Sequence, residues 1–107
     1  MQTTSDKKKL YSDQLIEDVM LRGRMYREII ADIRAGNINT TPHTVALDEV
    51  SRADLISYRV YKTPALEWLV DVLAHREDKR DNIEANTKLK FPELAYIRQM
   101  IIKYSKG

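Results

Sequence analysis

Apolar residues recur at three- and four-residue steps over residues 12–35, with charged residues between them. This spacing places the apolar side chains on one face of an α-helix. Gly36 and Asn37 follow, and both tolerate the left-handed backbone conformation that ends many helices. The pattern therefore predicts one long amphipathic helix from Ser12 to Ala35. Its apolar stripe consists of Leu15, Ile16, Val19, Tyr26, Ile29, Ile30 and Ile33.

The pattern changes after this helix. Residues 37–43 (NINTTPH) are rich in turn formers, and Pro42 prevents helix continuation, so a linker is predicted here. Thr44–Leu47 is short, apolar and partly β-branched, which is typical of a strand. Thr87–Phe91 alternates between polar and apolar residues and is closed by Pro92, so a second, half-buried strand is predicted there.

Two helix starts lie between these strands. Ser51 and Asp54 have the spacing of a capping box, with Ser51 as the N-cap. Thr63 is a capping residue, and Pro64 suits the first turn, where its missing N–H costs nothing. The middle segment is therefore predicted to run strand, helix, helix, strand. Its predicted core consists of Leu55, Ile56, Tyr58, Leu66, Trp68, Leu69 and Leu89.

A last helix is predicted from Glu93 to Ser105, with an apolar face that contains Leu94, Ile97, Ile101 and Tyr104. The predicted fold class is α+β and mostly helical. It comprises an N-terminal helical arm (1–36), a linker (37–43), a compact βααβ module (44–92) and a C-terminal helix (93–107).

Composition narrows the function classes. The chain has 107 residues, 43% of them hydrophobic and 32% charged, which is typical of a soluble domain. A net charge of +2 is too small to argue for a nucleic-acid partner. No run is apolar enough for a signal peptide or a membrane span, so no membrane partner is expected. The absence of cysteine excludes disulfides and thiolate chemistry.

Candidate catalytic and metal-binding residues are few. His43 and His75 have no second ligand at a spacing typical of a metal site. Glu67 and Asp71 lie four residues apart on one helix, which is typical of a solvated face rather than an acid pair across a cleft. Phosphate-binding loops and nucleophile elbows are absent. We therefore predict no enzyme activity, no metal and no cofactor.

The middle segment resembles the LysM module as it occurs in phage tail proteins. The resemblance covers residues 44–92 and rests on the strings DLISYRVYKTPALEWLVDVLA and IEANTKLKFP. The matching positions are Asp54, Leu55, Ile56, Tyr58, Tyr61, Pro64, Leu66, Trp68, Leu89 and Pro92. Small baseplate wedge proteins of contractile-tailed phages share the overall plan of a helical N-terminal part joined to a LysM-like end.

This resemblance implies a structural component of the tail baseplate, either a wedge or a tube-to-baseplate connector. Its partners would be other baseplate or tail proteins in a multi-copy symmetric assembly, and its place would be the virion, assembled in the host cytoplasm. The alternative that the resemblance leaves open is a peptidoglycan-binding module, with a groove lined by residues 51–54 and 75–82. The family's glycan-binding Asn has no clear counterpart here, although Asn82 is a shifted candidate.

Three further features bear on these alternatives. The family often has Gly where this chain has Lys62 and Asn86. Trp68 and the tyrosines fit either a core or a sugar-stacking surface, and core packing is favoured. The stripe of the long helix exceeds what a small module covers, so an interface with another subunit is predicted. The predicted interface residues are Leu15, Val19, Tyr26, Ile29 and Ile33, with Leu94, Ile97, Ile101 and Tyr104 on the C-terminal helix.

Overall fold

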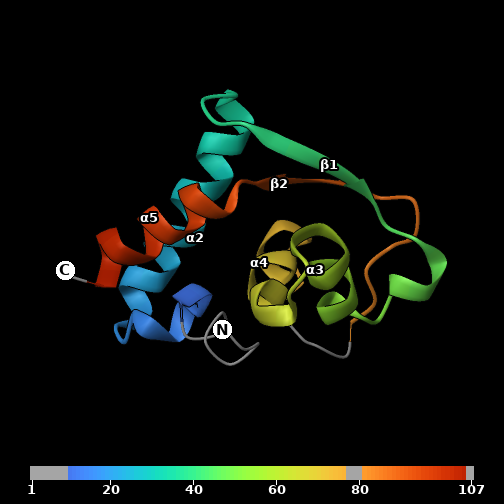
Figure 1. The fold of residues 1–107 in the computed structure, drawn as a ribbon, viewed down its shortest axis with the longest axis horizontal. Helices are drawn as coiled ribbons and strands as arrows, with labels where there is room; N and C mark the ends of the chain where they lie inside the picture. Colours follow the sequence, from blue (N-terminus) through green and yellow to red (C-terminus); the bar gives the residue numbers. More distant parts are fainter. Residues whose placement is uncertain (1–9, 77–80, 106–107) are drawn as a thin grey trace.

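The computed structural model describes residues 10–76 and 81–105. Within these residues the fold is α+β, with four α-helices, three short 3₁₀ helices and one two-stranded antiparallel sheet (Figure 1). The elements are η1 (Asp13–Leu15), α2 (Val19–Ala35), β1 (Thr40–Thr44), η2 (Leu47–Glu49), α3 (Ala53–Tyr61), η3 (Pro64–Leu66), α4 (Glu67–Leu73), β2 (Lys88–Pro92) and α5 (Leu94–Ser105). Helices α2 and α5 lie together on one side, and α3 and α4 pack beneath the sheet.

The predicted long N-terminal helix is divided in two. Ser12 caps η1 by accepting from the Gln14 N–H at 3.1 Å. The chain then becomes extended at Ile16, and Asp18 caps α2 by accepting from the Met20 N–H at 2.8 Å. The single helix from Ser12 was therefore wrong, because two N-capping side chains end one turn and start another. The predicted end at Gly36 is confirmed by its left-handed backbone, with φ of 73°.

The first strand lies at Thr40–Thr44 rather than at Thr44–Leu47, so part of the predicted linker is a strand. Thr44 pairs with Lys88 and Pro42 with Lys90 in the antiparallel register. The Val45 N–H donates to the Thr87 carbonyl at 2.9 Å and extends the ladder. Because bonded and non-bonded pairs alternate, Pro42 falls in a non-bonded pair and its missing N–H faces away from β2. This outward position explains why a proline is accommodated in β1.

The second strand was predicted at Thr87–Phe91 and lies at Lys88–Pro92, a shift of one residue. Its alternation of buried and exposed residues is confirmed. Leu89 and Phe91 are buried against the helices, while Lys88 and Lys90 are exposed. The structure also confirms the predicted C-terminal helix as α5.

The helix starts had different outcomes. Ser51 does not cap α3: Arg52 occupies the N-cap without a side-chain hydrogen bond, and it forms an ion pair with Asp54 at 3.0 Å. Thr63 accepts from the Ala65 N–H at 3.2 Å, and Pro64 begins η3, which leads directly into α4. The Thr63–Pro64 prediction is therefore confirmed, whereas the capping box at Ser51 was wrong.

Helix α3 ends at a lysine in the left-handed conformation. Lys62 has φ of 63° and donates its N–H to the Tyr58 carbonyl at 2.8 Å. Asn86 also has a positive φ, 69°. Both residues stand at the positions where the resemblance leads one to expect glycine. Asparagine tolerates this conformation more readily than lysine, so the strain lies mainly at Lys62.

We expect Lys62→Gly to raise the free energy of unfolding by about 1 kcal/mol, because glycine adopts this conformation without a steric penalty. The reciprocal control is Gly36→Ala, where an added Cβ meets no atom within 4 Å and only the backbone conformation matters. That variant should lose about 1 kcal/mol. Urea denaturation of both proteins measures the two changes. A Lys62→Gly protein less stable than the wild type contradicts the prediction.

One hydrophobic cluster connects both sides of the fold. Ile56, Leu66, Leu69 and Leu89 are buried in it as predicted, and Trp68 packs against it while partly exposed. Leu55 is partly exposed and lies outside the cluster. Tyr58 is 55% exposed, so its predicted place in the core was wrong. The cluster also includes residues of α2 and α5: Met25, Ile29, Ile97, Met100 and Ile101.

Two buried hydroxyls fix the module's geometry. Ser57 Oγ donates to the Thr63 carbonyl at 2.6 Å and accepts from the Leu66 N–H at 3.1 Å, which holds α3 against η3. The Tyr61 hydroxyl donates to the Pro92 carbonyl at 2.6 Å, which ties α3 to β2. Each of these buried groups has a partner and so avoids a desolvation cost.

Candidate functional site: the α2–α4 groove

Two adjoining hollows separate α2 from α4 and β2, and Ile30 and His75 line both of them. We call them together the α2–α4 groove. The larger hollow has a volume of about 470 Å³ and is lined by Asp13, Tyr26, Ile30, Trp68, Asp71, Val72, His75 and Arg76. The smaller has a volume of about 270 Å³ and is lined by Ile30, Ile33, Arg34, Leu73, His75, Lys88, Leu89 and Lys90.

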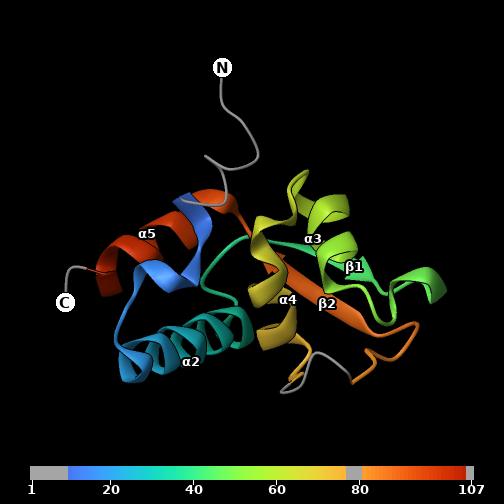
Figure 2. The same cartoon turned by 90° about the horizontal axis from the view of Figure 1, so that it is seen from below.

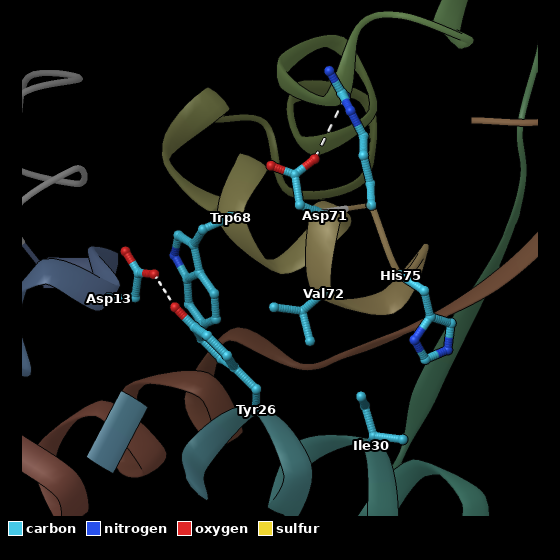
Figure 3. A pocket seen from close by; sticks show the side chains of 8 residues that line it. Asp13, Tyr26, Ile30, Trp68, Asp71, Val72 and His75 are labelled. Carbon is cyan, nitrogen blue, oxygen red and sulfur yellow. Dashed lines mark hydrogen bonds and ion pairs between the residues drawn. The ribbon is translucent and has the colours of Figure 1, made fainter. Parts of the chain in front are cut away.

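An aromatic pair forms one wall of the larger hollow (Figure 3). The rings of Tyr26 on α2 and Trp68 on α4 lie 5.9 Å apart between centroids and are tilted by 32°. Trp68 Nε1 donates to the Tyr11 carbonyl at 2.8 Å, and the Tyr26 hydroxyl donates to the Asp13 carboxylate. Both polar tips are therefore held by the segment around η1, which fixes the orientation of the wall.

Tyr26 is a hydrogen-bond donor at neutral pH. Burial raises its pKa well above the ordinary value, and the hydrogen bond to Asp13 and that residue's negative charge raise the pKa further. The phenol therefore stays protonated, and Asp13 accepts its proton in a hydrogen bond. This pair positions the aromatic wall rather than supplying a base.

The opposite wall of the groove carries charge. Arg76, beyond the end of α4, forms an ion pair at 3.4 Å with Asp71 on α4. His75 lies apart from this ion pair (Figure 3), is exposed and has a left-handed backbone with φ of 55°. Arg34, Lys88 and Lys90 line the smaller hollow beside the apolar side chains of Ile33 and Leu73. This mixture of apolar surface and rim charge suits the binding of another chain's side chains.

The comparisons with known proteins give no relative. No protein-family model, curated protein or solved structure matches this chain. The LysM-like interpretation therefore rests on the residue pattern and stays a prediction.

Two structural features concern metal-binding and membrane proteins. Residues 10–76 and 81–105 contain no group of three or more His, Cys, Asp or Glu side chains placed to hold a metal ion. No helix in this same part is long and apolar enough to cross a membrane.

The predicted interface residues separate into buried and exposed groups. Ile29, Ile97 and Ile101 are fully buried where α5 packs along α2, so their predicted contact with another subunit was wrong (Figure 2). Leu94 and Tyr104 are partly buried in the same contact, and the Tyr104 hydroxyl donates to Glu28. The physical reason is that α5 folds back on α2 and covers the part of the stripe around Ile29.

The exposed group lies at the end of η1 and the start of α2. Leu15 is 43% exposed and Val19 70%, and the neighbouring Met20 is 76% exposed. We call these three residues the N-terminal patch. Tyr26 and Ile33, the remaining predicted interface residues, line the α2–α4 groove. Met20 was not predicted, although it lies four residues after Ile16 and so fits the spacing of the stripe.

The sequence pattern also missed a buried acid. Glu49 has no exposed surface, and it accepts from the Ala46 N–H at 2.7 Å and from Arg59 Nη1 at 2.9 Å. His43 Nε2 lies 2.9 Å from Oε1 of Glu49. Burial acts to raise the pKa of Glu49, but these hydrogen bonds outweigh it and hold the pKa below the ordinary value. The available signal was the three-residue spacing from Ala46, which is half of a capping box.

Proposed function

We propose that this chain is a non-enzymatic structural protein of a phage tail baseplate, either a wedge or a tube-to-baseplate connector, that acts by docking onto neighbouring proteins. Two lines of support meet in this proposal. The residue pattern of 44–92 resembles LysM modules of phage tails, and the chain order strand, helix, helix, strand from Thr40 to Pro92 is compatible with that resemblance. The second line is the exposed apolar surface at the start of α2.

The N-terminal patch is the observation that carries the docking role. Leu15, Val19 and Met20 are apolar, close together in the chain and exposed, whereas the rest of the stripe is buried or lines the groove. Burying one such side chain on a partner contributes about 1.5–3 kcal/mol. In a symmetric assembly with many copies, modest contacts of this kind add through avidity.

Immunogold labelling of intact phage particles with an antibody against this chain tests the assignment. We expect gold at the distal end of the tail. The alternative of peptidoglycan binding predicts unlabelled particles and a protein that sediments with purified cell wall. That pair of results would overturn the structural role and favour the wall-binding one.

A charge placed in the N-terminal patch should weaken incorporation into tails. We expect Met20→Glu to reduce label density at the baseplate roughly tenfold or more, because a buried apolar contact is lost and a charge is desolvated. Its stability should stay within about 0.5 kcal/mol of the wild type, since the site is exposed.

Leu47→Glu is the matched control, because Leu47 is 81% exposed and lies on η2, away from the patch. This control should label like the wild type. If Met20→Glu also labels like the wild type, the N-terminal patch is not part of the interface. A loss confined to Leu47→Glu would place the contact on η2 instead.

A further inference from the structure

The outer edge of β2 directs backbone hydrogen-bonding groups away from β1. The Val45–Thr87 pair is hydrogen-bonded, so in the antiparallel register the pairs His43–Leu89 and Thr41–Phe91 are bonded as well. Lys88 and Lys90 lie in the alternate, non-bonded pairs and direct their N–H and C=O groups away from β1. Among residues 10–76 and 81–105, none hydrogen-bonds to these outward groups.

The two edges of the sheet differ in their capacity to accept another strand. On the outer edge of β1 the central position is Pro42, which has no N–H to donate. On β2 the proline at an outward position is Pro92 at the end of the strand, so the N–H groups of Lys88 and Lys90 are both available. Lysines on an edge strand repel like-charged strands and discourage neutral ones. As far as residues 10–76 and 81–105 are concerned, the edge of β2 is therefore open to pairing, and its charge selects the partner.

Side chains on the two faces of β2 specify an alternating partner. Lys88 and Lys90 are exposed on one face, and Leu89 and Phe91 are buried on the other. The smaller hollow of the groove follows this strand, with Ile30, Ile33 and Leu73 as its apolar lining. A strand added here would place every second side chain beside the lysines and the intervening ones toward the hollow.

Charge complementarity identifies the partner as acidic. Arg34, Lys88 and Lys90 all line the smaller hollow. None of the three has a carboxylate within ion-pair distance among the residues that the structure describes. A second copy of this chain does not meet the requirement, because β1 (TTPHT) has no acidic residue and β2 (KLKFP) would set lysine against lysine.

We propose that an extended acidic segment of a partner protein pairs with the outer edge of β2 as a third strand. Its acidic side chains lie beside Lys88, Lys90 and Arg34, and its alternate apolar side chains enter the hollow between α2 and α4. Main-chain hydrogen bonds supply the affinity and the alternating side chains supply the specificity. This inference rests on the docking role proposed above, and it names a second docking surface and the chemistry of the segment that fills it.

Peptide binding to the full chain tests the proposal. The probe is a fluorescein-labelled peptide of about six residues, the usual length of a strand, in which glutamate alternates with valine. We expect it to bind in fluorescence anisotropy and to shift the backbone amide resonances of Lys88 and Lys90. The same peptide with N-methyl groups on alternate amides keeps its charge but loses strand pairing, and it should not bind. A lysine–valine peptide should not bind either.

Charge reversal at the edge gives the second measurement. Lys88→Glu combined with Lys90→Glu should weaken binding of the glutamate–valine peptide roughly tenfold. Arg24→Glu is the control, because Arg24 is exposed on α2 and does not line the groove; it should leave binding unchanged. If the double variant fails to fold, Lys88→Gln and Lys90→Gln singly provide the same comparison with smaller losses.

Each other outcome overturns the proposal. Absence of binding excludes the acidic strand, binding that survives N-methylation indicates a purely electrostatic contact, and shifts confined to other residues place the site elsewhere. Self-association that depends on Lys88 and Lys90 would make a second copy the occupant. If the peptide does not bind but the baseplate is labelled, only the docking site at the β2 edge is excluded. If the peptide binds but the baseplate is not labelled, only the baseplate assignment is excluded.

Discussion

Replacement of Phe91 by alanine is expected to lower the free energy of unfolding by about 3–5 kcal/mol. Phe91 is 1% exposed at the centre of the cluster beneath the sheet. Its ring meets Tyr61 edge-on, with centroids 5.8 Å apart, and His43 at 6.2 Å. The loss combines the transfer free energy of the ring, the cavity it leaves and the edge-to-face contacts, which are worth about 0.5–1.5 kcal/mol per pair.

Urea denaturation followed by circular dichroism measures this loss. The control is Thr41→Ala, because Thr41 is exposed opposite Phe91 in the register and should change stability by less than about 0.5 kcal/mol. A loss near 5 kcal/mol would unfold a marginally stable domain. Phe91→Leu, with an expected loss of about 1–1.5 kcal/mol, keeps the test quantitative in that case. A Phe91→Ala protein within 1 kcal/mol of the wild type contradicts the packing described for β2.

Replacement of Glu49 by alanine is expected to cost about 2–4 kcal/mol. Its carboxylate is buried and joins three parts of the chain: the Ala46 N–H that starts η2, Arg59 on α3 and His43 on β1. Alanine removes all of these contacts and leaves the Ala46 N–H without its side-chain acceptor. Glu49→Gln keeps the volume but loses the charge, so it should cost less, about 1–2 kcal/mol.

The pH dependence of stability distinguishes the charge of Glu49 from its volume. Its pKa is held below the ordinary value in the folded state, so the unfolded chain binds the proton more readily. The stabilisation is therefore fully present above the unfolded pKa and is lost as pH falls through the folded pKa. Wild-type protein should lose stability below about pH 4, and Glu49→Gln should show a shallower slope there.

Asp54→Asn is the reference for this measurement. The pKa of Asp54 is also held below its ordinary value, first by the hydrogen bond from Arg52, but this pair is solvent-exposed. Solvent screening makes its contribution to the slope small. Urea midpoints at several acidic pH values should therefore separate Glu49→Gln from Asp54→Asn. Equal slopes for the wild type and Glu49→Gln would exclude the buried carboxylate as the main acid-sensitive group.

Local chemistry made several elements predictable from the sequence. Thr63 and Pro64 favour a helix start within their own turn, Gly36 ends a helix through its own backbone, and the alternation at Thr87–Phe91 reports burial on one face of a strand. Local competition explains the errors. Ser12 and Asp18 both cap, so η1 and α2 form in place of one helix. Pro42 suggested a linker, although an outward-facing proline is compatible with an edge strand.

The candidate site was less predictable, because its residues come from distant parts of the chain. Tyr26 and Trp68 meet across the groove, and Lys88 and Lys90 approach Ile30 and Ile33 only after α2, α4 and β2 have packed. Spacing along the sequence carries no information on such contacts. Glu49 is a similar case, since its partner Arg59 lies on another helix.

The sequence by itself determined the α+β class, the order of helices and strands after Gly36, and the burial of Ile56, Leu66, Leu69 and Leu89 in the middle segment. These properties follow from capping, turn formation and apolar periodicity, which act over a few residues. The tertiary structure alone decided that α5 covers Ile29 and leaves the N-terminal patch exposed, and that a groove opens beside the edge of β2. The reason is that an apolar stripe predicts that one face of a helix is buried, but the sequence pattern does not show which element covers that face. Only the packing of the whole chain decides this.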